Sequence, residues 1–391
     1  MDYRVRGNDG SWANVNASGR VARNLFLTLL AVAAIVYSAS AAQAATPSRL
    51  VAYVTGSPSF PAIPAERLTA INFAFAHMDA QGHAVLSAGS DAFIEKLCAL
   101  KARNPKLQIL ISVGGWGADG FSDAAASPAA RSAFADSVAD LLARTQTDGI
   151  DLDWEYPGLP GPGIKHRPED RENFTALLAA LHKRLDALAR ERRRERDPYA
   201  ITAALADGEF VAHIALGEIH RSLDWINLMT YDFHNSLTPQ TGHHAALRVS
   251  ASAGQNERSI EKAVAQFRAA GVPARKLVLG VPFYGRGFAD VHDANRGLDQ
   301  PYGRYAGDHS WPQLVADFID KNGFVRYWDS VARVPYLWNA DKREFISYDD
   351  PQSLALKAQY VKAHGLGGIM YWEQSQDPRG ELSAVLERAL H

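Results

Sequence analysis

Short β-rich runs alternate with helical stretches along most of the chain, and this alternation predicts a parallel sheet. The runs lie at residues 50–54, 70–75, 108–113, 149–154, 200–204, 225–230, 277–282 and 368–371. Eight strand–helix units predict a (β/α)8 TIM barrel, a fold in which catalytic side chains gather at the carboxyl ends of the strands. Candidate functional residues therefore belong near the ends of these runs.

The run at 149–154 carries the most informative polar pattern, because residues 148–155 read Asp-Gly-Ile-Asp-Leu-Asp-Trp-Glu. Successive side chains of a strand point to opposite faces, so Asp151, Asp153 and Glu155 share one face. The opposite face is apolar and consists of Ile150, Leu152 and Trp154. Neighbouring carboxylates repel each other and lose hydration when they are buried. The acidic face therefore indicates a functional use rather than a role in packing.

Two other interpretations of this acidic strand are weaker. An exposed edge strand would bring its carboxylates into water, but Trp154 and the aliphatic residues require burial on their side. No basic partner lies nearby, since the next cation after the segment is Lys165. A calcium-binding loop of the helix–loop–helix type is also disfavoured, because the glycine and the final glutamate fall at the wrong offsets.

The interval between the runs at 277–282 and 368–371 is the longest of the series and predicts an α+β insertion over about residues 288–345. We expect most of its aromatic residues to form a small core of its own. They are Tyr302, Tyr305, Trp311, Tyr327, Trp328, Tyr336 and Trp338.

Composition narrows the class of protein. The chain has 391 residues, 47% hydrophobic residues, 21% charged residues and a formal net charge of −2, which is typical of one globular domain or one domain with an insertion. Near-neutral charge argues against a nucleic-acid partner. Cys98 is the only cysteine and cannot form an internal disulfide, and the pair His243-His244 lacks metal-ligand spacing. We expect a monomer without metal or cofactor.

The N-terminus has the order of a secretory signal, in which a charged segment precedes an apolar segment and small residues. The basic residues are Arg4, Arg6, Arg20 and Arg23, the apolar segment is 25–37, and the small residues end in Ala42-Gln43-Ala44. We expect cleavage near Ala44, which makes 1–44 a signal peptide and 45–391 the catalytic barrel. The protein would then be extracellular or periplasmic without stable membrane association. An uncleaved anchor and a start codon downstream of Met1 remain alternatives.

The pattern Asp148-x-x-Asp151-x-Asp153-x-Glu155 resembles the active-site strand of the glycoside hydrolase family 18 chitinases. Four further segments resemble motifs of the same family, in the same order along the chain. They are Ser112-Val-Gly-Gly115, Met229-Thr-Tyr-Asp232, Gly280 to Arg286, and Gly368 to Glu373. The resemblance extends over about residues 49–385 and implies the bacterial type of this family, with an α+β subdomain that walls one side of the substrate groove.

The resemblance implies a role for each acid. Glu155 is nearest the carboxyl end of its strand and would be the general acid, with its pKa held up by Asp153. The family uses substrate assistance, in which the 2-acetamido oxygen attacks the anomeric carbon and an oxazolinium ion forms. Asp153 would turn to the acetamido N–H, Asp151 would share a proton with Asp153, Tyr231 would hold the acetamido oxygen, and Asp232 would bind the distorted sugar.

A second set of residues is expected to bind substrate, because aromatic faces suit the apolar faces of sugars. Trp372 would form the floor of the pocket, and Trp116 would stack a sugar on the leaving-group side. The other members of the set are Tyr53, Phe75, Met229, Tyr156, Ser112 and Arg286. The chain departs from many relatives at Leu237, where they carry a tryptophan, which puts in doubt one stacking surface on the leaving-group side.

The sequence thus predicts a secreted chitinase that cleaves β-1,4 bonds between N-acetylglucosamine units with retention of configuration. Two alternatives stay open. An endo-β-N-acetylglucosaminidase of glycoprotein glycans would use the same chemistry in a different groove, although the insertion favours a long linear polymer. A chitin-binding lectin on the same barrel is less compatible with the presence of Glu155.

Overall fold

The computed structural model describes residues 4–6, 9–10, 12–14, 48–57, 60–254 and 256–391. Near the N-terminus, β1 (Arg4–Arg6) and β2 (Trp12–Asn14) form a short antiparallel pair. The predicted apolar segment and the predicted cleavage site near Ala44 lie outside the described residues. Among the residues that are described, no helix combines the length and the apolar character needed to cross a membrane.

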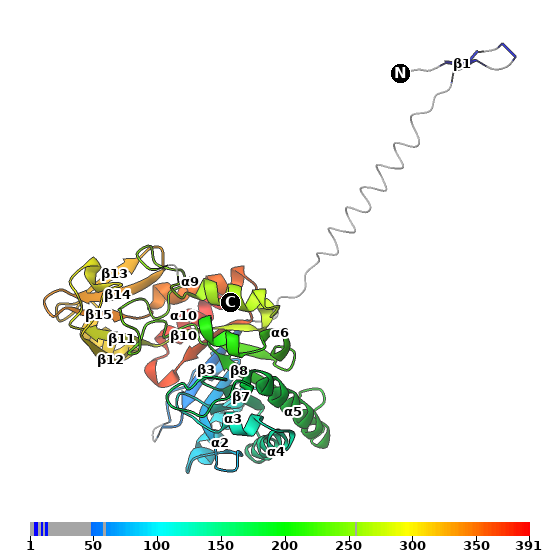
Figure 1. Cartoon of the computed structure of the whole chain (residues 1–391), viewed down its shortest axis with the longest axis horizontal. Coiled ribbons are helices and arrows are strands. Elements are labelled where there is room, and N and C mark those ends of the chain that lie inside the picture. The colour runs from blue at the N-terminus through cyan, green and yellow to red at the C-terminus, as the bar shows by residue number, and fades with distance from the viewer. Residues whose placement is uncertain (1–3, 7–8, 11, 15–47, 58–59, 255) are drawn as a thin grey trace. The chain divides into compact units, whose positions relative to one another are not determined.

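Eight parallel strands close into a barrel within the described residues after Pro47 (Figure 1). They are β3 (Arg49–Thr55), β4 (Ala70–Met78), β6 (Gln108–Gly114), β7 (Gly149–Asp153), β8 (Ala200–Leu205), β9 (Trp225–Leu228), β10 (Leu277–Pro282) and β16 (Gly368–Trp372). The sheet closes because β3 pairs with both β4 and β16. A short strand, β5 (Ala84–Val85), extends the end of β4. Each barrel strand coincides with a predicted run, so the predicted fold class is confirmed.

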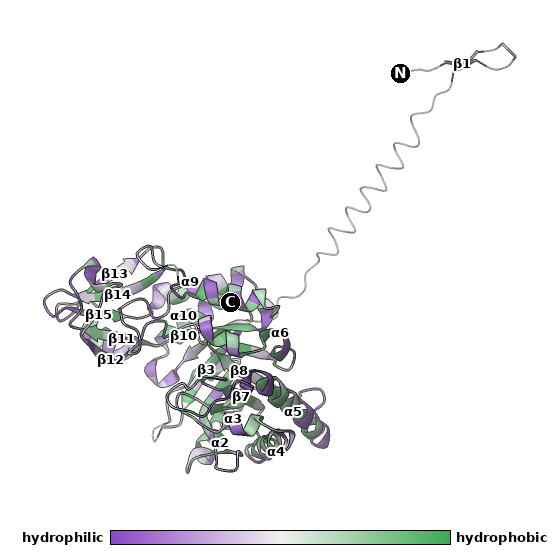
Figure 2. Cartoon of the chain, viewed as in Figure 1, coloured by the Kyte–Doolittle hydropathy of each residue, from purple (hydrophilic) through white to green (hydrophobic). Residues whose placement is uncertain are grey.

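Helices cover the outside of the barrel and present one apolar face to it (Figure 2). Those of the barrel are α2 (Ser90–Ala99), α3 (Phe121–Ala125), α4 (Pro128–Thr145), α5 (Asp170–Glu191), α6 (Leu216–Ile219), α7 (Ile260–Ala269), α9 (Pro351–Ala363) and α10 (Glu381–Leu390). A local signal fixes the start of α4: Ser127 Oγ accepts a hydrogen bond from Ala130 N at 3.2 Å, and Pro128 occupies the first position of the helix.

The barrel strands separate two layers of side chains, as the alternation along β7 predicts. Ile150, Leu152 and Trp154 point outward into the core shared with the helices, where Trp154 stacks on Phe121 at 5.3 Å. The inward layer mixes apolar residues with buried polar ones. Its buried polar members include Asn72, Ser112, Asp151, Asp153, Thr202 and Asn227. The acidic face of β7 therefore lies inside the barrel, against other polar side chains.

The predicted insertion between the seventh and eighth barrel strands is an antiparallel sheet in the order β12-β11-β15-β14-β13. Its strands are β11 (Tyr284–Ala289), β12 (Arg304–Ser310), β13 (Val325–Asp329), β14 (Val334–Asn339) and β15 (Glu344–Ser347), with α8 (Trp311–Gln313) between β12 and β13. Tyr336 and Trp338 belong to its own core, against which Tyr305 packs. Trp311 instead packs in the main core, and its Nε1 donates to Glu381 Oε2 of α10 at 2.8 Å. The insertion is thus joined to the barrel by buried contacts.

Candidate active site

Asp151 lies at the centre of the inward polar layer and accepts hydrogen bonds from four strands around it. Its Oδ2 accepts from Tyr53 Oη at 2.8 Å and from Ser112 Oγ at 2.7 Å. Its Oδ1 accepts from Thr202 Oγ1 at 2.5 Å and from Asn227 Nδ2 at 3.1 Å. Burial raises the pKa of the Asp151 carboxyl, and these four hydrogen bonds oppose the rise. The carboxylate is therefore fixed in place and has both oxygens engaged.

Asp153 differs from Asp151 in having a free oxygen. Asp153 is buried, and its Oδ1 has no hydrogen-bond partner among the described residues. Burial raises the pKa of Asp153 well above its usual value, and the charges of Glu155 and Asp151 add to the rise. Because donors occupy both oxygens of Asp151, a proton shared by this pair is favoured on Asp153.

Glu155 follows β7 and lies at the carboxyl end of the barrel. Burial raises the pKa of Glu155 to about 7, a hydrogen bond with Tyr156 opposes the rise, and the charge of Asp232 adds to it. A carboxyl group with this pKa can hold a proton near neutral pH and release it there, which is what a general acid that later acts as a base requires.

The Ser-x-Gly-Gly segment brings the end of β6 against β7. Gly114 has a φ of +120°, and a Cβ there would lie 2.0 Å from the carbonyl oxygen of Asp153. Gly115 has a φ of +93°, and its N–H donates to the same carbonyl at 2.9 Å. A side chain at Gly114 would force β6 away from β7, and one at Gly115 would bring its Cβ within 2.7 Å of the Phe75 ring. The two glycines therefore allow Ser112, paired with Asp151 in the register, to reach that carboxylate.

A cavity of about 800 Å³ opens at the carboxyl ends of the strands, in the size range of small-molecule sites. Ten of the predicted site residues line it: Phe75, Trp116, Asp153, Glu155, Tyr156, Met229, Tyr231, Asp232, Arg286 and Trp372. Leu237, where many relatives carry tryptophan, and Tyr284 of the Gly280 to Arg286 segment also line it. Residues that the sequence did not single out complete the wall: Leu159, Pro160, Gly161, Ala206, Glu209, Phe210, Asn235, Ser236, Arg258, Asp308 and Gln376.

Asp151, Tyr53 and Ser112 lie beneath this cavity and do not line it. The expectation that Tyr53 and Ser112 contact substrate does not fit their burial, since their exposed fractions are 1% and 0%. Both instead donate to Asp151. Strand alternation places both residues on the inward face of the barrel. They lie one layer below the carboxyl ends of the strands, where the Asp151 carboxylate needs hydrogen-bond donors.

Aromatic rings form the floor and one wall of the cavity. Trp372 stacks on Phe75 with ring centroids 5.6 Å apart and an interplanar angle of 22°. The Trp116 ring meets Tyr156 edge-on at 6.2 Å, and Tyr156 lies 4.2 Å from Phe210. Trp116 is 57% exposed and Leu237 is 75% exposed. Flat apolar faces are thus open to a ligand both beside Glu155 and farther along the cavity.

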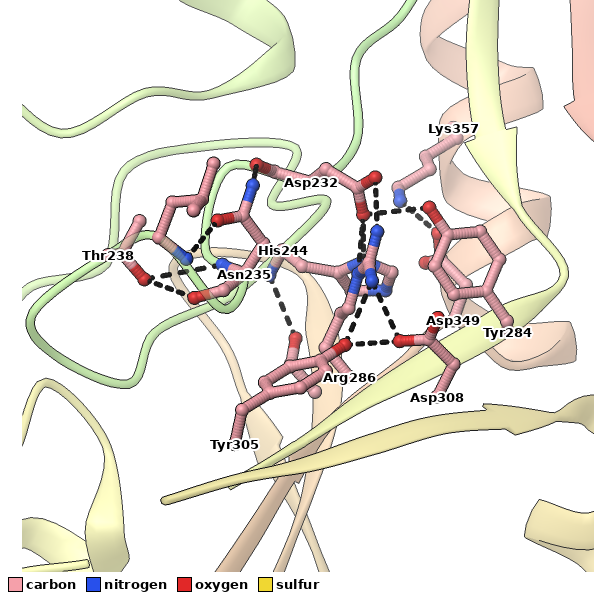
Figure 3. A network of polar contacts seen from close by, with 12 residues as sticks. Asp232, Asn235, Thr238, His244, Tyr284, Arg286, Tyr305, Asp308, Asp349 and Lys357 are labelled. Carbon is pink, nitrogen blue, oxygen red and sulfur yellow. Dashed lines mark hydrogen bonds and ion pairs between the residues drawn. The ribbon is translucent and has the colours of Figure 1, made fainter. Parts of the chain in front are cut away.

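Asp232 anchors a polar cluster on another part of the wall (Figure 3). Its Oδ1 accepts from Tyr284 Oη at 2.7 Å and Arg286 Nε at 2.8 Å, while its Oδ2 accepts from Arg286 Nη2 at 2.5 Å. Arg286 Nη1 also donates to Tyr305 Oη at 2.8 Å and Asp308 Oδ1 at 2.7 Å. Burial alone would raise the pKa of Asp232, but the cationic and hydrogen-bonding neighbours hold it well below its usual range. Asp232 is therefore an anion.

A family model described as Glycosyl hydrolases family 18 matches residues 36–377. The chain belongs to this family. The family 18 segment includes every barrel strand and the whole insertion.

Relatives of known name agree with this assignment. Chitinase A1 of Niallia circulans is 41% identical over 313 residues, which cover 76% of this chain and 44% of that protein. Chitotriosidase-1 of Mus musculus is 35% identical over 78% of this chain and 66% of its own length. Chitinase B of Serratia marcescens is 31% identical over 83% of this chain and 76% of its own length. The family 18 chain thus spans less than half of the first of these relatives and about two thirds of the second.

Solved structures of family 18 proteins superimpose on this chain and agree with the family assignment. A family 18 N-acetylglucosaminidase from Paenibacillus barengoltzii superimposes with a TM-score of 0.81 at 37% identity, covering 88% of this chain and all of that one. Chitinase ChiA74 from Bacillus thuringiensis superimposes with a TM-score of 0.82 at 32% identity, covering 88% of this chain and 70% of that one.

Proposed function

We propose that this protein is a chitinase that hydrolyses β-1,4 bonds between N-acetylglucosamine units. Membership of family 18 and the names of the relatives support this proposal. The observation that carries it is the pairing of Glu155 and a free Asp153 carboxyl in one aromatic-walled cavity. Glu155 can protonate a glycosidic oxygen, and the rings of Trp372 and Trp116 can bind sugar faces.

The cavity also favours a nucleophile that belongs to the substrate. A double displacement on the enzyme needs a second carboxylate across the bond from the acid. Asp151 is beneath the cavity with both oxygens engaged, and Asp232 is held by Arg286 and Tyr284. Asp153 lies on the same strand face as Glu155 and so approaches the bond from the side of the acid. The substrate's own acetamido oxygen can take the role of nucleophile instead.

The proposed reaction assigns one action to each group. Protonated Glu155 donates to the leaving oxygen while the acetamido oxygen bonds to the anomeric carbon, giving an oxazolinium ion. Asp153 accepts a hydrogen bond from the acetamido N–H, and the Tyr231 hydroxyl donates to the acetamido oxygen. Glu155, now a carboxylate, then takes a proton from water as the water oxygen bonds to the anomeric carbon. The bond between that carbon and the acetamido oxygen breaks, which opens the oxazolinium ring and gives net retention. To reach the acetamido N–H, the Asp153 side chain turns toward the substrate. It can turn because its Oδ1 has no hydrogen-bond partner, whereas Asp151 is held by four donors.

The pH dependence follows from Glu155. Its pKa is raised from 4.5 to about 7, so the protonated form that starts the reaction persists to neutral pH and is lost above it. We expect kcat/KM on chitotetraose to fall tenfold per pH unit above about pH 7, and initial rates between pH 3 and 10 will test this. A plateau that extends to pH 9 would contradict the assignment of Glu155 as the acid.

Trp116 should matter most for long substrates. Its exposed ring lies on the Tyr156 side of the cavity, and Leu237, which is also exposed on the cavity wall, offers no aromatic face. Trp116→Ala should raise KM for chitohexaose by about three- to tenfold, the size of one lost stacking contact, with a smaller change for chitobiose linked to a chromophore. Leu237→Trp is the matched gain variant and should lower KM for the hexamer. Equal effects on both substrates would show that Trp116 acts only in packing.

A second candidate is an N-acetylglucosaminidase, because a structure of that name superimposes over its whole length. The decisive experiment offers the purified protein chito-oligosaccharides of two to six units and a biantennary N-glycopeptide, with products separated by mass. Internal cleavage of the pentamer and hexamer supports a chitinase. Single sugars released stepwise support the second candidate, and cleavage of the glycopeptide core supports an endo-β-N-acetylglucosaminidase. Binding without cleavage of any of them would support a lectin.

We also propose that the protein is a secreted monomer, with residues 1–44 as the signal peptide, 45–391 as the catalytic barrel and 288–345 as the insertion. The order of charged, apolar and small residues near the N-terminus supports export. N-terminal sequencing of protein from the culture medium or periplasm will locate the cleavage site, and size-exclusion chromatography will give the oligomeric state. Retention of residues 25–37 in a membrane fraction would support an uncleaved anchor.

A further inference from the structure

His244 is a buried histidine beside the cavity to which the reaction above gives no role. Its side chain has no exposed surface, and neither ring nitrogen has a hydrogen-bond partner within normal limits. Its backbone is fixed, since its N–H donates to Ser347 Oγ at 2.9 Å and its carbonyl accepts from Phe233 N at 3.1 Å. Buried polar groups nearly always have partners, so an imidazole in this state needs an explanation.

The nearest polar group to the His244 ring is the carboxylate of Asp232. His244 Nδ1 lies 3.5 Å from Asp232 Oδ1, on the side of the carboxylate that also meets Tyr284 (Figure 3). The ring packs edge-on against Tyr284 with centroids 5.3 Å apart. An Nδ1–H therefore points along a short path to Asp232, and hydrogen bonds in active sites are often long before substrate binds and tighten in the complex.

Charged groups from several elements face this ring. Asp232 lies after β9, Tyr284 and Arg286 belong to β11, and Asp349 precedes α9. Asp349 is itself paired with the buried Lys357 of α9 and accepts from Ser353 Oγ at 2.6 Å. Burial and Arg286 lower the pKa of His244 below its ordinary 6.5, while Asp232 and Asp349 oppose that change. The ring is therefore neutral at pH 7 and gains its charge only under more acidic conditions.

We propose that His244 is a positioning residue for Asp232, which keeps that carboxylate ionised and oriented toward the bound sugar and does so more strongly once the ring is protonated. This inference rests on the proposed chitinase function, in which Asp232 binds the distorted sugar. The His244 ring is among the groups that hold the pKa of Asp232 down. Its protonation places a positive charge 3.5 Å from the carboxylate and therefore opposes protonation of Asp232.

Two substitutions at His244 separate the effect of its hydrogen bond to Asp232 from the effect of the charge on its protonated ring. In His244→Asn the amide N–H can replace Nδ1–H but cannot titrate, whereas His244→Leu removes both. At pH 7 we expect His244→Asn to keep kcat/KM on chitotetraose within about threefold of the wild type and His244→Leu to lose about tenfold or more, the loss expected for a hydrogen bond to a charged group. At pH 4 the asparagine variant should also fall behind the wild type.

His243 supplies the matched control. It is the adjacent residue, is equally buried, and pairs through Nε2 with Asp329 Oδ2 at 3.1 Å, away from Asp232. His243→Asn and His243→Leu should change the unfolding temperature without moving the acidic limb of the pH profile. If the leucine variants of His243 and His244 lower kcat/KM in parallel at every pH, His244 acts only in packing and the inference is overturned.

A binding measurement separates this inference from the proposed function. In protein carrying Glu155→Gln, calorimetry at pH 4 and pH 7 can compare chitotriose affinity with and without His244→Leu. Weaker binding in the His244 variant, with the larger loss at pH 4, supports the inference whether or not the wild type hydrolyses chitotetraose. Equal affinities overturn it, even if hydrolysis by the wild type confirms the chitinase function.

Discussion

Replacing Glu155 with glutamine should lower kcat on chitotetraose by about 10²–10⁴-fold, the usual contribution of a general acid. Glutamine has nearly the same shape but no proton to donate at any pH of the assay. Oligosaccharide affinity should change little, because the aromatic floor at Trp372 and the Asp232 cluster are intact. Single-turnover kinetics and calorimetry on the same preparation measure the two quantities independently.

The stability of this variant gives a check on its folding. The carboxyl of Glu155 has a pKa of about 7 in the folded protein and about 4.5 in an unfolded chain, so the folded state holds the proton more tightly. The stability that Glu155 contributes is therefore complete below pH 4.5 and is lost as the pH rises to 7. Since glutamine does not titrate, the variant should unfold at a higher temperature than the wild type at pH 8. Glu209→Gln, at another carboxylate of the cavity wall, serves as the control and should keep most of the activity.

Retention of more than about a tenth of wild-type kcat by Glu155→Gln would mean that another group protonates the leaving oxygen. The described cavity wall offers Asp153 as the nearest such group, because its pKa is also raised. The double variant Glu155→Gln with Asp153→Asn would then be measured. A further fall in kcat would identify Asp153 as a second acid, and an unchanged kcat would mean that the residual turnover needs no acid from Asp153.

Period-two alternation made the barrel and its acidic interior predictable. It placed Ile150 and Leu152 against the helices and Asp151 and Asp153 inside, because a strand in a closed barrel has one face in each layer. Alternation does not give depth along the barrel axis. Tyr53 and Ser112, which the resemblance places among the substrate-binding residues, have hydroxyl groups that donate to Asp151, and neither residue lines the cavity.

The cluster around Asp232 lay beyond sequence reasoning for a different reason. Arg286 follows β10 within a recognisable segment, but Tyr305 and Asp308 reach it only because β12 pairs with β11 in the insertion. The register Arg286 to Asp308 depends on how two distant segments fold together, and no local pattern encodes it. Sequence reasoning likewise assigned His244 no role at the site, because its surroundings depend on Ser347 and Asp349, about a hundred residues later in the chain.

The acetyl group of the substrate provides the other large expected effect. Chitotetraose should be cleaved, whereas the fully deacetylated tetramer should show no turnover above background, a difference of at least about 10³-fold if the acetamido oxygen is the nucleophile. Glucosamine lacks that oxygen, and the described carboxylates are poorly placed to replace it, since Asp153 lies on the same strand face as Glu155 and Asp232 is held by Arg286 and Tyr284. Calorimetry on Glu155→Gln will show whether the deacetylated tetramer still binds, which separates lost chemistry from lost affinity.

Partly acetylated chitosan extends the same test within one molecule. The sugar on the non-reducing side of the cleaved bond must carry the nucleophile, so every new reducing end should be N-acetylglucosamine, while new non-reducing ends can be either sugar. Asp153→Asn should depress kcat far more than KM, because its hydrogen bond to the acetamido N–H strengthens as charge develops. Mass spectrometric sequencing of the products decides the matter. A substantial fraction of glucosamine at new reducing ends would require a protein nucleophile, and Asp232, freed from Arg286, would be the first carboxylate to test.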